Sequence, residues 1–126
     1  MTIDIDLPCE PDSVGRAREA LARLEGSVSG QRLGDLRLLV SELVTNAIRH
    51  AGMSADESIQ LRVNLAADTL RVEVADRGQG FTPSAPPIDP SRPSGWGLYL
   101  VEELAEDWGV DPGPPTRVWF ELATSS

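Results

Sequence analysis

The chain contains no lysine, and all eleven of its basic residues are arginines. This absence excludes Schiff-base chemistry and any phosphate contact that depends on a lysine ammonium group. Cysteine is limited to Cys9, so the chain can form neither an internal disulfide nor a cysteine-based metal site. Histidine is limited to His50. Chemistry built on clusters of these three residue types is therefore excluded.

Long apolar runs are also missing. None approaches the ~18 residues that a bilayer-spanning helix needs. The first residues carry acids where a signal peptide needs a basic start. We therefore expect a cytoplasmic protein with no membrane partner. The formal net charge of −9 argues against direct nucleic-acid binding, which needs clustered positive charge. A length of 126 residues predicts a single domain spanning residues 1–126.

Alternating and helical apolar patterns define the expected elements. They are a strand at 2–7, a helix from 12 to about 25, a helix from Gln31 or Asp35 to Ala51, a hairpin of strands 59–65 and 70–74, a helix from 97 to about 107, a loop at 108–115 and a strand at 116–123. Five prolines exclude regular structure from 82 to 94. The order βααββαβ predicts an α/β (α+β) two-layer sandwich, with helices on one face of a mixed, mostly antiparallel sheet.

Polar residues interrupt the apolar pattern of the second helix in the segment E-L-V-T-N-A-I-R-H, which runs from Glu42 to His50. Glu42 and Asn46 are one turn apart, so they lie one above the other on the same stripe. His50 continues the row with a modest angular drift. A polar stripe of this kind is also typical of an ordinary solvated helix face. The segment alone therefore leaves both interpretations open.

A second segment, V-E-V-A-D-R-G-Q-G-F, ends a strand at Asp76 and continues with Gly78 and Gly80. Glycine lets a flat ring approach the backbone, because no Cβ stands in the way. A carboxylate only accepts hydrogen bonds, so it can pair with the exocyclic amino group of adenine. A plain turn after a strand would give the same residues.

The third segment, G-W-G-L-Y-L-V, contains Gly95, Gly97 and Leu98 at the start of a helix. Backbone N–H groups at such a start carry partial positive charge, which suits phosphate oxygens. The alternative is an ordinary glycine-rich helix start after a proline-rich loop.

In their order and approximate spacing, these three segments resemble the N box and the two glycine boxes of the GHKL ATPases. This superfamily joins gyrase, a heat-shock chaperone, sensor histidine kinases and a mismatch-repair ATPase. The resemblance covers about residues 35–122 and implies the GHKL fold, with ATP and Mg²⁺ as ligands. It also implies that residues 81–94 form the lid over the nucleotide.

The resemblance assigns roles to individual residues. Glu42 would be the general base, and Asn46 would hold the magnesium ion, which needs few protein ligands. Asp76 would specify adenine, and Thr116 would assist it, often through water. His50 would have a supporting role. The remaining residues of the expected nucleotide site are Gly78, Gly80, Gly95, Gly97 and Leu98.

The sequences of the motifs and of the C-terminal strand are most similar to those of stand-alone bacterial anti-sigma factor serine kinases. These proteins bind a sigma factor and phosphorylate a serine on an anti-anti-sigma antagonist of STAS type. We therefore expect a protein-serine kinase that uses Mg²⁺·ATP and forms a homodimer. Trp96 departs from the subgroup, which carries arginine there. Two alternatives stay open: a non-catalytic ATP-binding interaction module, and an ATP-binding domain split from a histidine kinase system.

Overall fold

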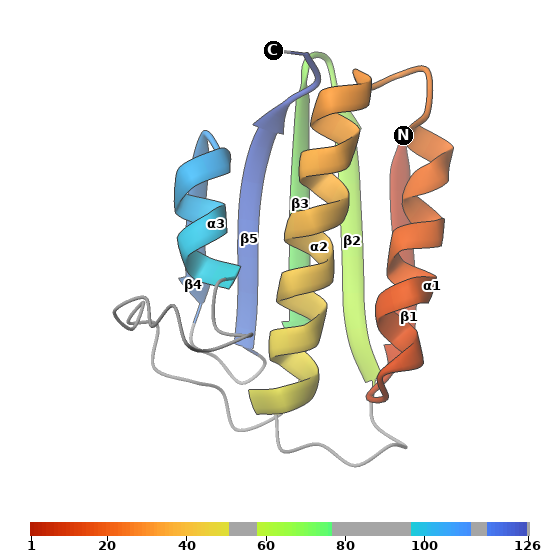
Figure 1. Cartoon of the computed structure of the whole chain (residues 1–126), viewed down its shortest axis with the longest axis vertical. Helices are drawn as coiled ribbons and strands as arrows, with labels where there is room; N and C mark the ends of the chain where they lie inside the picture. Colours follow the sequence, from red (N-terminus) through yellow and green to blue (C-terminus); the bar gives the residue numbers. More distant parts are fainter. Residues whose placement is uncertain (51–57, 77–96, 112–115, 126) are drawn as a thin grey trace.

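The computed structural model describes residues 1–50, 58–76, 97–111 and 116–125 as one antiparallel sheet covered on one face by helices (Figure 1). In chain order the elements are β1 (Thr2–Pro8), α1 (Asp12–Ala20), the short 3-10 helix η1 (Leu21–Leu24), α2 (Gly30–His50), β2 (Ser58–Ala66), β3 (Thr69–Asp76), α3 (Gly97–Leu104), β4 (Asp107–Asp111) and β5 (Thr116–Ala123). The predicted two-layer α/β sandwich is confirmed.

The five strands are arranged in the order β1-β2-β3-β5-β4, and each neighbouring pair is antiparallel. The expected hairpin is present as β2 and β3, with Ala67 in the left-handed region at its turn (φ 55°). Two details of the prediction are wrong. The sheet has a fifth strand, β4, where we expected a loop, and its described pairings include no parallel pair.

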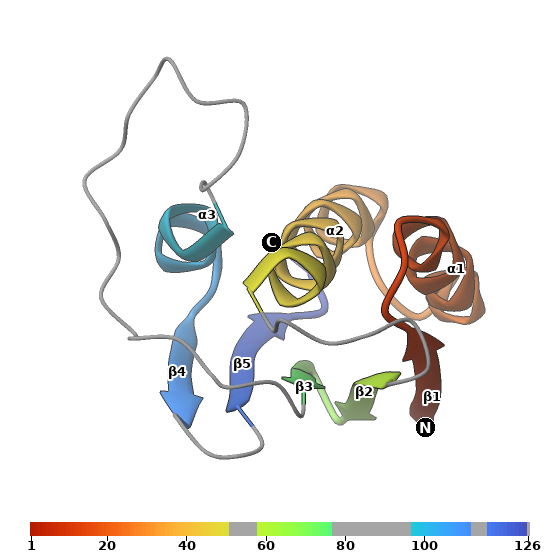
Figure 2. The ribbon, with the colours of Figure 1, turned by 90° about the horizontal axis from the view of Figure 1, so that it is seen from below.

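The described helices lie on the same face of the sheet, and α2 lies between α1 and α3 (Figure 2). The core forms between this layer and the sheet. Its largest fully buried side chains are Phe120, Ile3, Leu21, Leu24, Leu36, Leu39, Ile59, Leu61, Leu70, Leu122, Val40 and Val44. The alternation of β3 shows why: Leu70, Val72 and Val74 are buried, while Arg71 and Glu73 between them are half-buried.

Helix α2 begins at Gly30, slightly earlier than expected, because Ser29 caps it. The Ser29 hydroxyl accepts a hydrogen bond from the Arg32 backbone N–H at 3.2 Å, and the Ser29 carbonyl accepts one from the Leu33 N–H at 2.8 Å. A serine in this place satisfies backbone donors that the first turn leaves unpaired. The cap thus sets the start of the helix that carries Glu42 and Asn46.

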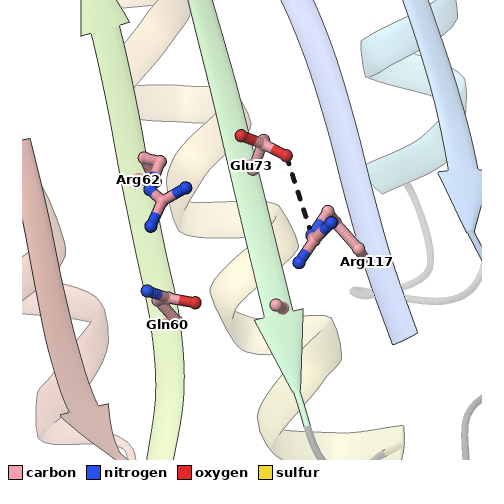
Figure 3. Close-up of a pocket in the computed structure, with 5 residues that line it drawn as sticks. Gln60, Arg62, Glu73 and Arg117 are labelled. Atoms are coloured by element: carbon pink, nitrogen blue, oxygen red, sulfur yellow. Dashed lines mark ion pairs between the residues drawn. The ribbon is translucent and has the colours of Figure 1, made fainter. Parts of the chain in front are cut away.

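The opposite face of the sheet has no helix over it in the described part of the chain and is charged (Figures 2 and 3). Three ion pairs cross between strands on this face: Arg62–Asp4 at 3.1 Å, Arg71–Glu121 at 3.3 Å and Arg117–Glu73 at 3.6 Å. Between residues 1 and 125, the described helices include none with the length and apolar character needed to cross a bilayer.

Candidate functional site

The candidate site begins on α2, where Glu42 and Asn46 are both half-buried. Their neighbours Leu43, Val44 and Ala47 are buried in the core, so the apolar side of the helix holds the polar stripe in place. Within the described residues, neither the Glu42 carboxylate nor the Asn46 carboxamide makes a side-chain hydrogen bond or ion pair. No other described residue therefore competes with a ligand for either group.

The hydroxyl of Thr45, next to this stripe, is already hydrogen-bonded within α2. It donates to the Ser41 carbonyl at 2.7 Å, and the Ser41 hydroxyl donates to the Arg37 carbonyl at the same distance. Both hydroxyls are thus engaged by the helix backbone one turn earlier. His50 is the last residue of α2, and its side chain lies outside the described residues.

The second part of the site lies at the end of the sheet where β3 ends and β5 begins. Asp76 is the last residue of β3, Thr116 is the first of β5, and the two are paired directly across the strands. The sheet therefore brings the backbones of Asp76 and Thr116 together, while their roles at a nucleotide site stay predictions.

Four elements meet at one end of the sandwich (Figure 1). The C-terminal half of α2, the end of β3, the start of β5 and the start of α3 all lie toward the same end. Helix α2 packs against β3, β5 and α3. The fold therefore brings Glu42, Asn46, Asp76 and Thr116 to one region, although they come from three separate segments of the sequence.

The glycine boxes are described only in part. Gly97 is the first residue of α3, and Leu98 follows it in the helix, as predicted. Gly78, Gly80 and Gly95 lie outside the described residues, and so does the expected lid at 81–94. The phosphate-binding roles of these residues stay predictions.

The donor set fits a magnesium ion bound together with phosphates. The described residues contain no cluster of three or more His, Cys, Asp or Glu side chains that could hold a metal by itself. Magnesium usually takes few protein ligands and completes its shell with phosphate oxygens and water. The Asn46 carboxamide, which makes no hydrogen bond with another described side chain, is compatible with this mode of binding.

The structure also contains hollows that the sequence did not predict. An open surface hollow of about 380 Å³ lies between the α1–η1 segment and α2 and is lined by Arg18, Glu19, Ala22 and Arg37. A smaller hollow on the open sheet face lies over Ala75, between Gln60 and Arg117 (Figure 3). Neither hollow is lined by a residue of the candidate site.

This fold, with its site at one end, is that of an ATP-binding domain related to histidine kinases. The family model for the histidine kinase-like ATPase domain matches residues 7–120. The chain belongs to this family. The predicted fold class and family are thereby confirmed.

Individual proteins that are similar to this chain are also kinases by name. The chain is 32% identical over 120 residues to the serine-protein kinase RsbW of Oceanobacillus iheyensis, covering 83% of this chain and 75% of that protein. It is 31% identical to the RsbW of Bacillus subtilis, with 83% and 74% covered. The solved histidine kinase domain of a blue-light activated histidine kinase from Erythrobacter litoralis is 26% identical, with a TM-score of 0.60. That match covers 93% of this chain and spans 61% of the solved chain.

Proposed function

We propose that the protein binds Mg²⁺·ATP where α2 and α3 meet the end of β3 and the start of β5. Asp76 accepts a hydrogen bond from the adenine amino group, with Thr116 beside it, and Asn46 holds the magnesium ion. Gly78, Gly80, Gly95, Gly97 and Leu98 complete the nucleotide site, and residues 81–94 form its lid in a single domain of 126 residues. The observation that carries the proposal is the direct pairing of Asp76 with Thr116, at the same end of the sandwich as Glu42 and Asn46.

The bound nucleotide would supply the phosphoryl group, and its magnesium ion would neutralise phosphate charge. Glu42 would accept the proton of a serine hydroxyl as that oxygen forms its bond to phosphorus. The bond between the terminal phosphorus and the ADP oxygen breaks, and ADP leaves. Glu42 suits this task because it is half-buried, makes no side-chain hydrogen bond or ion pair with another described residue, and lies one helical turn from the proposed metal ligand.

The protein would act as an anti-sigma factor that phosphorylates a serine of an anti-anti-sigma antagonist of STAS type. Two observations support this assignment. The two RsbW relatives described above are named serine-protein kinases. The motif sequences of this chain resemble those of anti-sigma factor kinases. The sigma factor and the antagonist would be its partners, and the protein would be a homodimer.

The first test is a thermal-shift titration with Mg²⁺·ATP, Mg²⁺·ADP and Mg²⁺·GTP on wild type and on Asp76→Asn. A ligand that binds only the folded state stabilises it by about 2.7 kcal/mol at a concentration 100-fold above its Kd. We expect the adenine nucleotides alone to raise the Tm, and we expect Asp76→Asn to lose the effect. The matched control is Asp68→Asn, the same change in the turn that precedes β3.

The outcomes separate the candidate functions. An unchanged adenine shift in Asp76→Asn would refute the pocket assignment. No shift with any nucleotide would favour an interaction module without nucleotide binding. If nucleotide binds, the acid stability of the labelled product distinguishes phosphoserine from the acid-labile phosphohistidine of a split histidine kinase system.

A further inference from the structure

Leu38 is a large apolar side chain on the outward surface of α2, and it is 43% exposed. Among the described residues, Met1 at the chain end is the other large hydrophobic side chain that is exposed to this degree. Single exposed leucines are common and need no explanation by themselves. The position of Leu38 relative to Glu42 is what makes it informative.

Leu38 precedes Glu42 by one helical turn, so both lie on the same side of α2. The residue before Leu38 is Arg37, which lines the open hollow between the α1–η1 segment and α2. The nearby hydroxyls of Ser41 and Thr45 are engaged by backbone carbonyls. The surface around Leu38 therefore offers an apolar contact and few free hydrogen-bonding groups, immediately beside the proposed base.

We propose that the serine-bearing segment of the protein substrate lies across this surface, with an apolar side chain packed on Leu38. The inference rests on the proposed kinase function, because that function requires a serine hydroxyl within hydrogen-bonding reach of the Glu42 carboxylate. A segment that brings its serine to Glu42 must cover the neighbouring turn of α2. Leu38 then determines substrate specificity without taking part in the chemistry.

The spacing on α2 defines the substrate pattern. Four residues of α-helix rise about 6 Å, which separates Leu38 from Glu42 along the axis. An extended peptide advances about 3.3 Å per residue, and its alternate side chains point to the same side. A substrate segment that runs extended along the α2 axis, with its serine at Glu42, therefore places the side chain two positions away against Leu38.

The test measures phosphoryl transfer from labelled Mg²⁺·ATP to synthetic peptides with one central serine. One set carries leucine two positions before or after the serine, and the matched set carries glutamine there. For wild type we expect a KM about tenfold lower for a leucine peptide, with little change in kcat, because burying an apolar side chain strengthens binding. Leu38→Gln should abolish this preference, and Leu38→Met should keep it.

Leu38→Gln replaces an exposed residue with a good helix former of similar size and adds no charge beside Glu42. Its thermal shift with Mg²⁺·ADP should equal that of wild type, which shows that the fold and the nucleotide site are intact. Equal KM values for both peptide sets in wild type would overturn the inference, and so would a preserved preference in Leu38→Gln. A protein that binds Mg²⁺·ATP yet phosphorylates no peptide would also overturn it. Absence of nucleotide binding would instead overturn the proposed function, and this inference with it.

Discussion

Asp76 and Thr116 stand directly opposite each other in the sheet, as Cα partners of the antiparallel strands β3 and β5. Directly opposite residues in such a pair have Cα atoms about 4.5–5.5 Å apart. The strand register, and not the local sequence around either residue, therefore creates the proximity. Because β3 ends and β5 begins here, the pair lies where these two inner strands meet one end of the sheet.

A prediction for Thr116 follows from this pairing. Thr116→Val keeps the shape and the strand preference of the residue but removes its hydroxyl. We expect weaker binding of Mg²⁺·ADP by about fivefold, since one hydrogen bond is worth about 1 kcal/mol. Isothermal titration calorimetry measures the change. Thr69→Val is the matched control, because Thr69 opens β3 at the opposite end of the sheet. Equal losses in both variants would contradict a specific role for Thr116.

Glu42 provides a test of catalysis that is separate from binding. We expect Glu42→Ala to bind Mg²⁺·ADP as wild type does, while phosphoryl transfer falls by about 10²–10⁴-fold, the usual contribution of a general base. Calorimetry and a transfer assay from labelled ATP measure the two quantities. Glu103→Ala, the same change at an exposed position on α3, should leave both unchanged. Equal turnover in Glu42→Ala would mean that the base lies elsewhere.

Asp4 provides a prediction about pH. The pKa of its carboxyl is lowered chiefly by the hydrogen bond from the Gln60 amide at 3.1 Å, and then by Arg62. A lowered pKa in the folded state contributes stability at pH values above the unfolded pKa, and this contribution is lost as the pH falls through the folded pKa. Gln60→Ala should raise the pKa of Asp4, as measured by NMR titration. Asn64→Ala, on the same strand, should leave the pKa of Asp4 unchanged.

Most of the fold could be predicted because alternation and helical periodicity are strong in this chain. Strand β4 could not. Its sequence D-W-G-V-D contains glycine and two aspartates, which are depleted in strands. It pairs with β5 alone, at the sheet edge, so tertiary pairing rather than local preference forms it. Similarly, the single helix expected from 12 to about 25 is α1 followed by the tighter turn of η1, with Leu21 and Leu24 both buried.

One part of the candidate site could be predicted from the sequence pattern, and the other part could not. Glu42 and Asn46 lie one turn apart, so helical spacing alone places them together. Their neighbourhood with Asp76 and Thr116 depends on β3 pairing with β5, which no local pattern specifies. Leu38 lies off the three-and-four spacing of the buried residues Leu36, Leu39 and Val40, so helical periodicity agrees with its exposure.

Gly109 links the unpredicted strand to a specific packing requirement. The Trp119 ring lies over this glycine, and a Cβ at Gly109 would be 2.7 Å from the ring Nε1 and 2.8 Å from Cε2. The Arg71 guanidinium lies 4.2 Å from the ring centroid and helps to hold the ring in place. We therefore expect Gly109→Ala to lower the free energy of unfolding by about 1–3 kcal/mol, the usual cost of overpacking.

Denaturant unfolding of Gly109→Ala and Gly34→Ala measures this effect against a matched control. Gly34 lies inside α2, and a Cβ there would meet nothing within 4 Å. The same substitution should therefore stabilise the protein by about 0.5–1 kcal/mol, since alanine favours a helix interior more than glycine does. Opposite signs for the two variants would show that Trp119 requires a glycine beneath it. Stabilisation by Gly109→Ala would mean that the ring moves freely off β4 and that the strand does not depend on this contact.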